Sequence, residues 1–138
     1  MTRSAGTALL LLLATTLAAC SEPQHVTVPP TDADPTEVVQ AYVAAINARD
    51  RDALATLSED GAIPETWLGT RIDLVEIDEP YADTGAGTRH DGEDVIGVPV
   101  QVVVHGSDGS LPEGEQIGWG YLLVQQDGRW VVFDQGVG

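Results

Sequence analysis

Three side chains in the sequence, those of Asp73, His105 and Asp134, are the candidates for acid–base chemistry in a cavity. A carboxylate becomes an effective general base when burial raises its pKa toward the working pH. Asp134 stands beside Gln135 and Gly136 at the expected end of a strand, where an acid is usually exposed or closes a turn, and His105 borders a turn-rich stretch. None of the three lies in a motif specific for catalysis. The sequence therefore favours a protein without enzymatic activity.

Histidines and acidic loops are the only candidates for metal ligands. His25 lies in a proline-containing segment, and His90 lies in the acidic stretch 90–94. That stretch and residues 107–110 supply oxygens, but neither has the spaced ligands of a calcium loop. The sequence also has no Cys/His zinc spacing and no glycine-rich phosphate loop. We expect neither a metal nor a cofactor.

The charge balance is strongly acidic, with a formal net charge of −16 at pH 7. Such a surface repels phosphate backbones. We expect no nucleic-acid partner, and we interpret most of the acidic residues as a solvated, solubilising surface.

The first nineteen residues have the layout of a signal peptide. Arg3 provides a positive start, and the largely apolar run 8–19 follows it. As a helix this run would span about 18 Å, which is short of a hydrocarbon core about 30 Å thick. An ordinary cleaved secretion signal is the closest alternative to the lipoprotein signal described next.

The residues Leu17-Ala18-Ala19-Cys20 resemble the bacterial lipobox. That resemblance implies a diacylglycerol on the Cys20 thiol and cleavage just before it. Several acyl chains hold a protein stably at a bilayer, because each buried methylene contributes about 0.8 kcal/mol. The expected location is the cell membrane, on its extracytoplasmic face, with the lipid on Cys20 as the membrane contact.

The mature chain divides into a tether, residues 20–33, and a single domain, residues 34–138. The tether contains three prolines and no sustained periodicity, and at about 3.1 Å per residue it would reach roughly 40 Å. The domain begins where Asp34, Pro35 and Glu37 form a helix N-cap, a proline at the first helical position and a capping box.

Hydrophobic periodicity predicts helices first and strands afterwards. Val38, Tyr42 and Ile46 recur every four residues, as on the buried face of a helix, and Asp50 begins a second, shorter helix. Alternating apolar residues then predict strands, whereas 62–69 is ambiguous and 80–94 is predicted as a loop or a weak, exposed pairing. The predicted strands are 72–77, 96–104 with Pro99 at an edge or bulge, and a hairpin of 117–126 and 129–134 around Asp127-Gly128.

This order of elements is an α+β arrangement, and its residues resemble a known family. Residues 35–42, running into 46–50 and Ala53-Leu54, resemble the opening helices of the nuclear transport factor 2-like (SnoaL-like) superfamily. Residues 120–124, then 127–132 and Asp134, resemble its closing hairpin. The resemblance implies N-terminal helices packed on a curved, mostly antiparallel sheet, in a cone-shaped, cystatin-like arrangement with an internal pocket.

The family also implies what the cone contains. Its enzymes place an Asp, sometimes with a His or Tyr, inside the cone, which adds Tyr42 and Tyr121 to the acid–base candidates. Aromatic side chains either line a pocket for an apolar ligand or fill the core. The candidates for this pocket are Tyr42, Trp67, Trp119, Tyr121 and Trp130.

The second apolar face of the hairpin needs a cover, for which a second subunit and the 80–94 loop are open alternatives. The function that we expect is non-enzymatic: an anchored domain that binds a small apolar ligand or a protein partner in the cell envelope. The alternative is a SnoaL-like isomerase, cyclase or dehydratase that uses an Asp general base in the cone.

Overall fold

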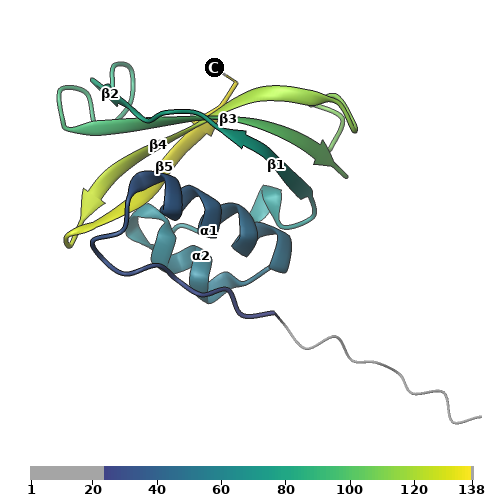
Figure 1. Ribbon diagram of the computed structural model, residues 1–138, viewed down its shortest axis with the longest axis horizontal. Helices are drawn as coiled ribbons and strands as arrows, with labels where there is room; N and C mark the ends of the chain where they lie inside the picture. Colours follow the sequence, from purple (N-terminus) through teal and green to yellow (C-terminus); the bar gives the residue numbers. More distant parts are fainter. Residues whose placement is uncertain (1–23, 138) are drawn as a thin grey trace, which may run out of the picture.

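The computed structural model describes residues 24–137, and within them the chain folds as an α+β domain. The helices lie against one face of an antiparallel sheet (Figure 1). The predicted α+β class, with helices on an antiparallel sheet, is thereby confirmed. The elements are α1 (Pro35–Ala48), α2 (Arg51–Leu57), the 3-10 turns η1 (Glu59–Gly61) and η2 (Glu65–Trp67), and the strands β1 (Arg71–Ile77), β2 (Tyr81–Asp83), β3 (Val95–His105), β4 (Gln116–Gln126) and β5 (Arg129–Gly136).

The two helices begin where the capping residues predict. The backbone N–H of Asp34 donates to Glu37 Oε2 at 3.1 Å, which satisfies a group at the start of α1. Arg49 adopts a left-handed conformation with φ 56° and ends α1. Asp50 then caps α2, because its Oδ1 accepts a hydrogen bond from the Ala53 N–H at 3.1 Å.

The sheet has the strand order β1-β3-β4-β5, and β2 also pairs with β3. Asp127 and Gly128 both have positive φ, 53° and 79°, as the tight turn between β4 and β5 requires. Pro99 was predicted at an edge or bulge, but β3 is an interior strand. Pro99 lies in the gap between the part of β3 that pairs with β1 and the part that pairs with β2, so its missing N–H is tolerated there. Its carbonyl accepts a hydrogen bond from the Asp78 N–H at 2.9 Å.

The core lies between the helices and the inner face of the sheet. Alternate residues of β3, namely Val98, Val100, Val102 and Val104, point toward α1 and α2 and are almost fully buried. Asn47 fixes α1 to the β1 edge, because its side chain both donates to the Ile72 carbonyl (2.7 Å) and accepts from the Ile72 N–H (2.8 Å).

The outer face of the hairpin carries a second, smaller core. Val124 and Val131 are buried there together with Val95, the first residue of β3, which directly follows the 84–94 loop. From that loop the His90 ring packs edge-on against Phe133, with ring centroids 4.6 Å apart. The loop therefore contacts this face directly, as expected if the loop is the cover of the hairpin. A homodimer stays a prediction that the mass in solution would test.

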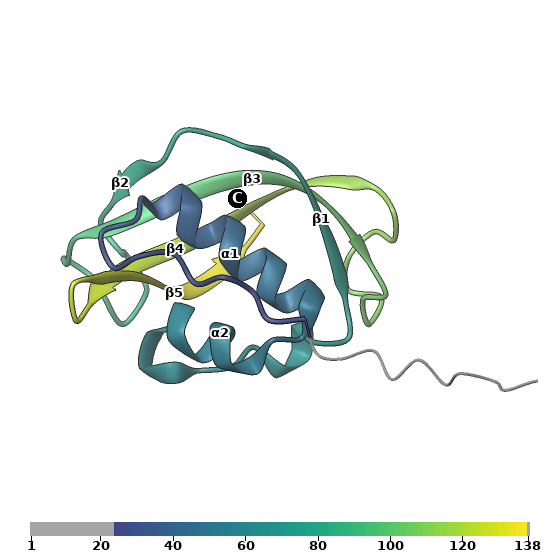
Figure 2. The ribbon, with the colours of Figure 1, turned by 60° about the horizontal axis from the view of Figure 1, so that its bottom comes forward.

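Residues 24–33, the described part of the predicted tether of 20–33, lie along the domain and pack on it. Val26 and Val28 contact the main core and Ala33 is buried. The Val26 N–H donates to Asp50 Oδ2 at 2.7 Å, and Arg129 Nη1 donates to the Pro29 carbonyl at 2.6 Å. Figure 2 shows this segment running alongside the helices. The apolar side chains and the Asp50 carboxylate explain this packing, because they give the segment a surface to bury and a partner for its backbone.

Candidate functional site

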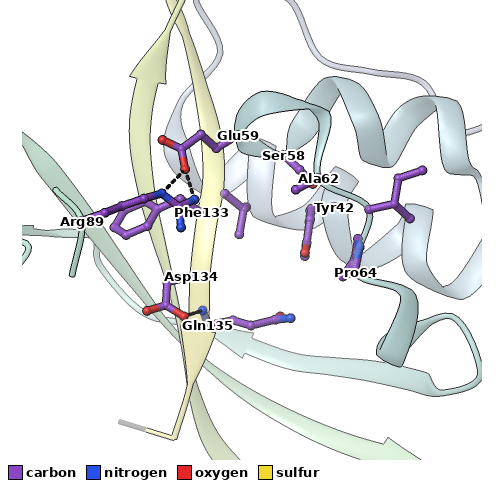
Figure 3. Close-up of a pocket in the computed structure, with 11 residues that line it drawn as sticks. Tyr42, Ser58, Glu59, Ala62, Pro64, Arg89, Phe133, Asp134 and Gln135 are labelled. Atoms are coloured by element: carbon purple, nitrogen blue, oxygen red, sulfur yellow. Dashed lines mark hydrogen bonds and ion pairs between the residues drawn. The ribbon is translucent and has the colours of Figure 1, made fainter. Parts of the chain in front are cut away.

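A cleft of about 210 Å³ lies between the helical layer and β5 (Figure 3). Its volume is smaller than the 300–1,000 Å³ typical of sites for drug-sized ligands, so it suits a small molecule. Its lining combines apolar and polar side chains. It is formed by Tyr42, Ser58, Glu59, Ala62, Ile63, Pro64, Arg89, Val132, Phe133, Asp134 and Gln135.

Local structure explains why the cleft forms here. Tyr42 belongs to the buried stripe of α1, which directs its ring toward the sheet. Ser58 follows α2 in an extended conformation and forms an isolated parallel bridge with Val132 of β5. This bridge holds the end of α2 and η1 against the edge of the sheet, so the segment 58–64 becomes the wall opposite β5.

Buried polar atoms without partners gather at this cleft. Ser58 is only 4% exposed, and its Oγ has no hydrogen-bond partner among the described residues. The same holds for Oε1 of Gln135 and for the hydroxyl of Tyr121. Tyr121 pairs with Gln135 across the β4–β5 ladder, and its ring packs edge-on against Tyr42 with centroids 5.7 Å apart. We call Tyr42, Ser58, Tyr121 and Gln135 the polar cluster.

An unsatisfied buried polar group costs about 1–3 kcal/mol. Within the described residues, three buried side-chain atoms have no hydrogen-bond partner, and all three belong to the polar cluster. The cost is therefore concentrated at one place in the fold. In native proteins such groups are rare, and they occur where strain is stored, where a functional role requires them, or where a water or an ion completes them. The polar cluster is therefore the strongest candidate for a functional site.

The tyrosine hydroxyls of the cluster are neutral. Burial raises the pKa of Tyr42 to about 12, and the nearby Ser58 side chain lowers it by a smaller amount. The two hydroxyls lie near each other but do not meet hydrogen-bond geometry, so Ser58 Oγ stays without a partner. Burial also raises the pKa of Tyr121, and the nearby Tyr42 adds to the rise. Neither tyrosine supplies a phenolate near neutral pH. Both act as hydrogen-bond donors or acceptors, which suits binding better than proton abstraction.

A network of ion pairs forms one side of the cleft. Glu59, only 8% exposed, accepts hydrogen bonds from Nε of Arg89 at 2.7 Å, from Nη2 of the same guanidinium, and contacts His90 Nε2 at 2.5 Å. The other ring nitrogen of His90 lies 2.8 Å from Glu93 Oε2. The Glu93 carboxylate and then Glu59 raise the pKa of His90, although desolvation opposes them. The Arg89 guanidinium also lies over the Phe133 ring, 5.7 Å from its centroid.

Sequence reasoning did not find this network. It treated residues 90–94 as surface acid and gave Glu59 no role. The local signal was weak: Arg89-His90 is a short basic pair within an acidic stretch. Its partner Glu59 lies thirty residues earlier, and no local pattern connects the two positions.

The three candidate acid–base residues lie in two different places. Asp73 of β1 and His105 of β3 contact each other, with Asp73 Oδ2 3.0 Å from His105 Nε2, and Arg71 Nη2 donates to the same carboxylate at 3.1 Å. Neither Asp73 nor His105 lines the cleft. Asp134 does, but its side chain is exposed at the cleft mouth.

The five predicted pocket aromatics also separate. Tyr42 lines the cleft and Tyr121 packs behind it. Trp67 and Trp119 pack edge-on with centroids 5.3 Å apart at the main core, and Trp130 packs against the same core from β5. Trp67 additionally borders a separate hollow next to residues 107–111.

Within residues 24–137, no helix is long and apolar enough to cross a membrane, and no three His, Cys, Asp or Glu side chains group as a metal site would require. The predicted signal peptide and Cys20 lie outside the described residues. No protein-family model, curated protein or solved structure matches the chain.

Proposed function

We propose that this chain is an extracytoplasmic lipoprotein, anchored through Cys20, whose domain binds a small, largely apolar molecule in the cleft beside the polar cluster. The observation that carries the binding role is the set of buried atoms without partners on Ser58, Tyr121 and Gln135. A bound molecule would supply the missing hydrogen bonds and cover the apolar wall of Ile63 and Pro64.

We further propose that the helices and the sheet form the cone of the nuclear transport factor 2-like arrangement. The position of the cleft supports this, because its lining comes from α1, from the segment after α2 and from the last strand. The order of elements supports it too, with helices first and a hairpin last. The proposed ligand site then corresponds to the opening of the cone.

Binding is preferred over catalysis because of the state of the cleft's ionisable groups. Glu59 is the buried carboxylate of the lining, and Arg89 and His90 already occupy its oxygens. The lining contains one aspartate, Asp134, which is exposed and so lacks the burial that would make it a strong general base.

Native mass spectrometry of the full mature chain, extracted from the membrane of its own host in mild detergent, tests the binding role. The expected result is an additional mass, one molecule per chain, that is lost in an Ala62→Trp variant. Ala62 is exposed and lines the cleft, so tryptophan there fills the cleft without replacing a buried side chain.

The matched control is Ala44→Trp. Ala44 is an exposed residue of α1 that is not part of the cleft lining, so the additional mass should persist in this variant. Wild-type protein without any additional mass would contradict the proposal, as would a mass retained equally by both variants.

A further inference from the structure

The unpaired groups of the polar cluster specify the chemistry of a ligand. The unpaired groups are the hydroxyls of Ser58 and Tyr121, which can each donate a hydrogen bond, and Oε1 of Gln135, which only accepts. The Tyr42 hydroxyl belongs to a residue of the same cleft lining and can also donate. In Figure 3 the hydroxyl end of Tyr42 is turned toward the side chain of Gln135. A molecule that offers an acceptor to the hydroxyls and a donor to Gln135, close together, therefore completes the cluster and uses the hydroxyls as donors.

We propose that the cleft recognises a small neutral molecule that carries a carbonyl oxygen next to an N–H or O–H group, as a carboxamide does, on a hydrocarbon body. This inference rests on the proposed binding function and names its ligand class. The carbonyl oxygen accepts from the hydroxyls of Tyr42 and Ser58, which line the cleft, and the adjacent N–H or O–H donates to Gln135. The hydrocarbon body contacts Ile63 and Pro64.

Charge separates this class from acids of the same shape. The cleft lining holds two carboxylates, Glu59 and Asp134, and one cation, Arg89, which already donates two hydrogen bonds to Glu59. A carboxylate ligand would meet a net negative lining in a chain of net charge −16. An anion would also lose its hydration beside neutral hydroxyls, which offset that cost only in part.

A cationic ligand matches the cluster less well than a neutral one. An amidinium offers donors but no acceptor, so the hydroxyls of Ser58 and Tyr121 would have to serve as acceptors only. Both groups are buried, so a full charge brought to them is desolvated without a charged partner in contact. Attraction by Asp134 at the cleft mouth acts across solvent and is screened by salt.

The size of the cleft limits the ligand to about one ring. A volume of about 210 Å³ corresponds to roughly seven water molecules at about 30 Å³ each. Benzamide, benzoate and benzamidine are suitable probes because they share one shape and differ in charge, and toluene provides the hydrocarbon without the polar group.

The test is a titration of the mature chain from residue 20, carrying Cys20→Ala, followed by amide chemical shifts. Benzamide should shift the amides of Ser58, Val132 and Gln135 and bind at least tenfold more tightly than benzoate, benzamidine or toluene. Tyr42→Phe removes one hydroxyl at nearly constant shape and should weaken benzamide about fivefold while leaving toluene unchanged. The Ala62→Trp variant should abolish the shifts, and Ala44→Trp should preserve them.

The outcomes distinguish the ligand class from the binding role. If benzoate, benzamidine or toluene binds the cleft as tightly as benzamide, or if Tyr42→Phe weakens all probes equally, the ligand class is wrong and the cleft remains a binding site. If benzamide causes no shifts while the native protein retains another molecule, the class is also wrong. If no probe binds and the native protein retains nothing, both proposals fail.

Discussion

Nε2 of His90 lies 2.5 Å from Oε1 of Glu59, although 31 residues separate the two along the chain. This contact fastens the 84–94 loop, which covers the outer face of the hairpin, to η1, which forms a wall of the cleft. Because Glu93 holds the other ring nitrogen at 2.8 Å, both nitrogens face carboxylates and the protonated imidazole satisfies both.

The His90 contacts predict a pH-dependent stability. Glu93 and Glu59 raise the pKa of His90 in the folded state above its unfolded value of about 6.5. The stabilisation is therefore complete below about pH 6.5 and is lost as the pH rises through the folded-state pKa. The charged groups that face the imidazole are Glu59, Glu93 and the neighbouring Arg89. When His90 loses its proton, one of its two nitrogens can no longer donate a hydrogen bond to a carboxylate.

Urea unfolding between pH 6 and pH 9, compared for wild type and His90→Gln, measures this effect. Glutamine keeps one amide donor and does not titrate, so the stability difference should favour wild type most at pH 6 and shrink toward pH 9. A difference that stays constant, or grows with pH, would show that His90 does not carry the pH dependence.

Removal of the Ser58 hydroxyl should stabilise the ligand-free domain. Its Oγ is buried without a partner, so Ser58→Ala relieves a desolvation cost and should raise the free energy of unfolding by about 1 kcal/mol. Thr56→Ala is the control, because the exposed Thr56 hydroxyl already bonds the Asp52 carbonyl, and the expected change is within about 0.5 kcal/mol. Chemical denaturation measures both. A Ser58→Ala variant that is less stable than wild type would mean that the hydroxyl is satisfied in the ligand-free protein.

Loss of the Asp50 carboxylate should release the segment before α1. Its Oδ2 accepts from Val26 N–H at 2.7 Å, its Oδ1 caps α2, and these backbone donors hold the pKa of Asp50 below its usual range. In Asp50→Ala, amide hydrogen exchange at Val26 and at Ala53 should accelerate together, whereas exchange within β3 should not change. Unaltered exchange at Val26 would indicate that apolar packing alone holds the segment. The same carboxylate contacts are lost when the pH falls through the lowered pKa, so acid should release the segment as well.

The proposed membrane anchor depends on one side chain, that of Cys20. Cys20→Ala should move most of the chain from the membrane fraction to the soluble or secreted fraction, because the acyl chains supply the binding energy. Ser21→Ala, which changes the next residue and leaves the thiol in place, should remain with the membrane. Fractionation and immunoblotting measure both variants, and an unchanged membrane fraction for Cys20→Ala would rule out the lipid anchor.

The sequence predicted the elements that local rules determine. The capping box at Asp34 and Glu37, the helix start at Asp50 and the Asp127-Gly128 hairpin all lie where they were expected. Each depends on residues within a few positions of one another, so capping and turn chemistry suffice to locate them.

Contacts between distant residues were not predictable in this way. The attachment of Val26 to Asp50, the Glu59–His90 contact and the bridge between Ser58 and Val132 join residues 24 or more positions apart. Such pairs depend on the final packing and leave no periodic signal. For the same reason the sequence left open whether the five aromatic candidates line a pocket or fill the core. It did not distinguish Tyr42, which lines the cleft, from Trp119, which fills the core.

The central claim, that the polar cluster is a ligand site, is tested most directly by a crystal structure of the mature chain purified from its own host. The account predicts density for one small molecule in the cleft, with a polar atom within hydrogen-bond distance of Ser58 Oγ and of the Tyr42 or Tyr121 hydroxyl. A cleft closed by protein side chains, with the hydroxyls of the cluster bonded to one another, would contradict it.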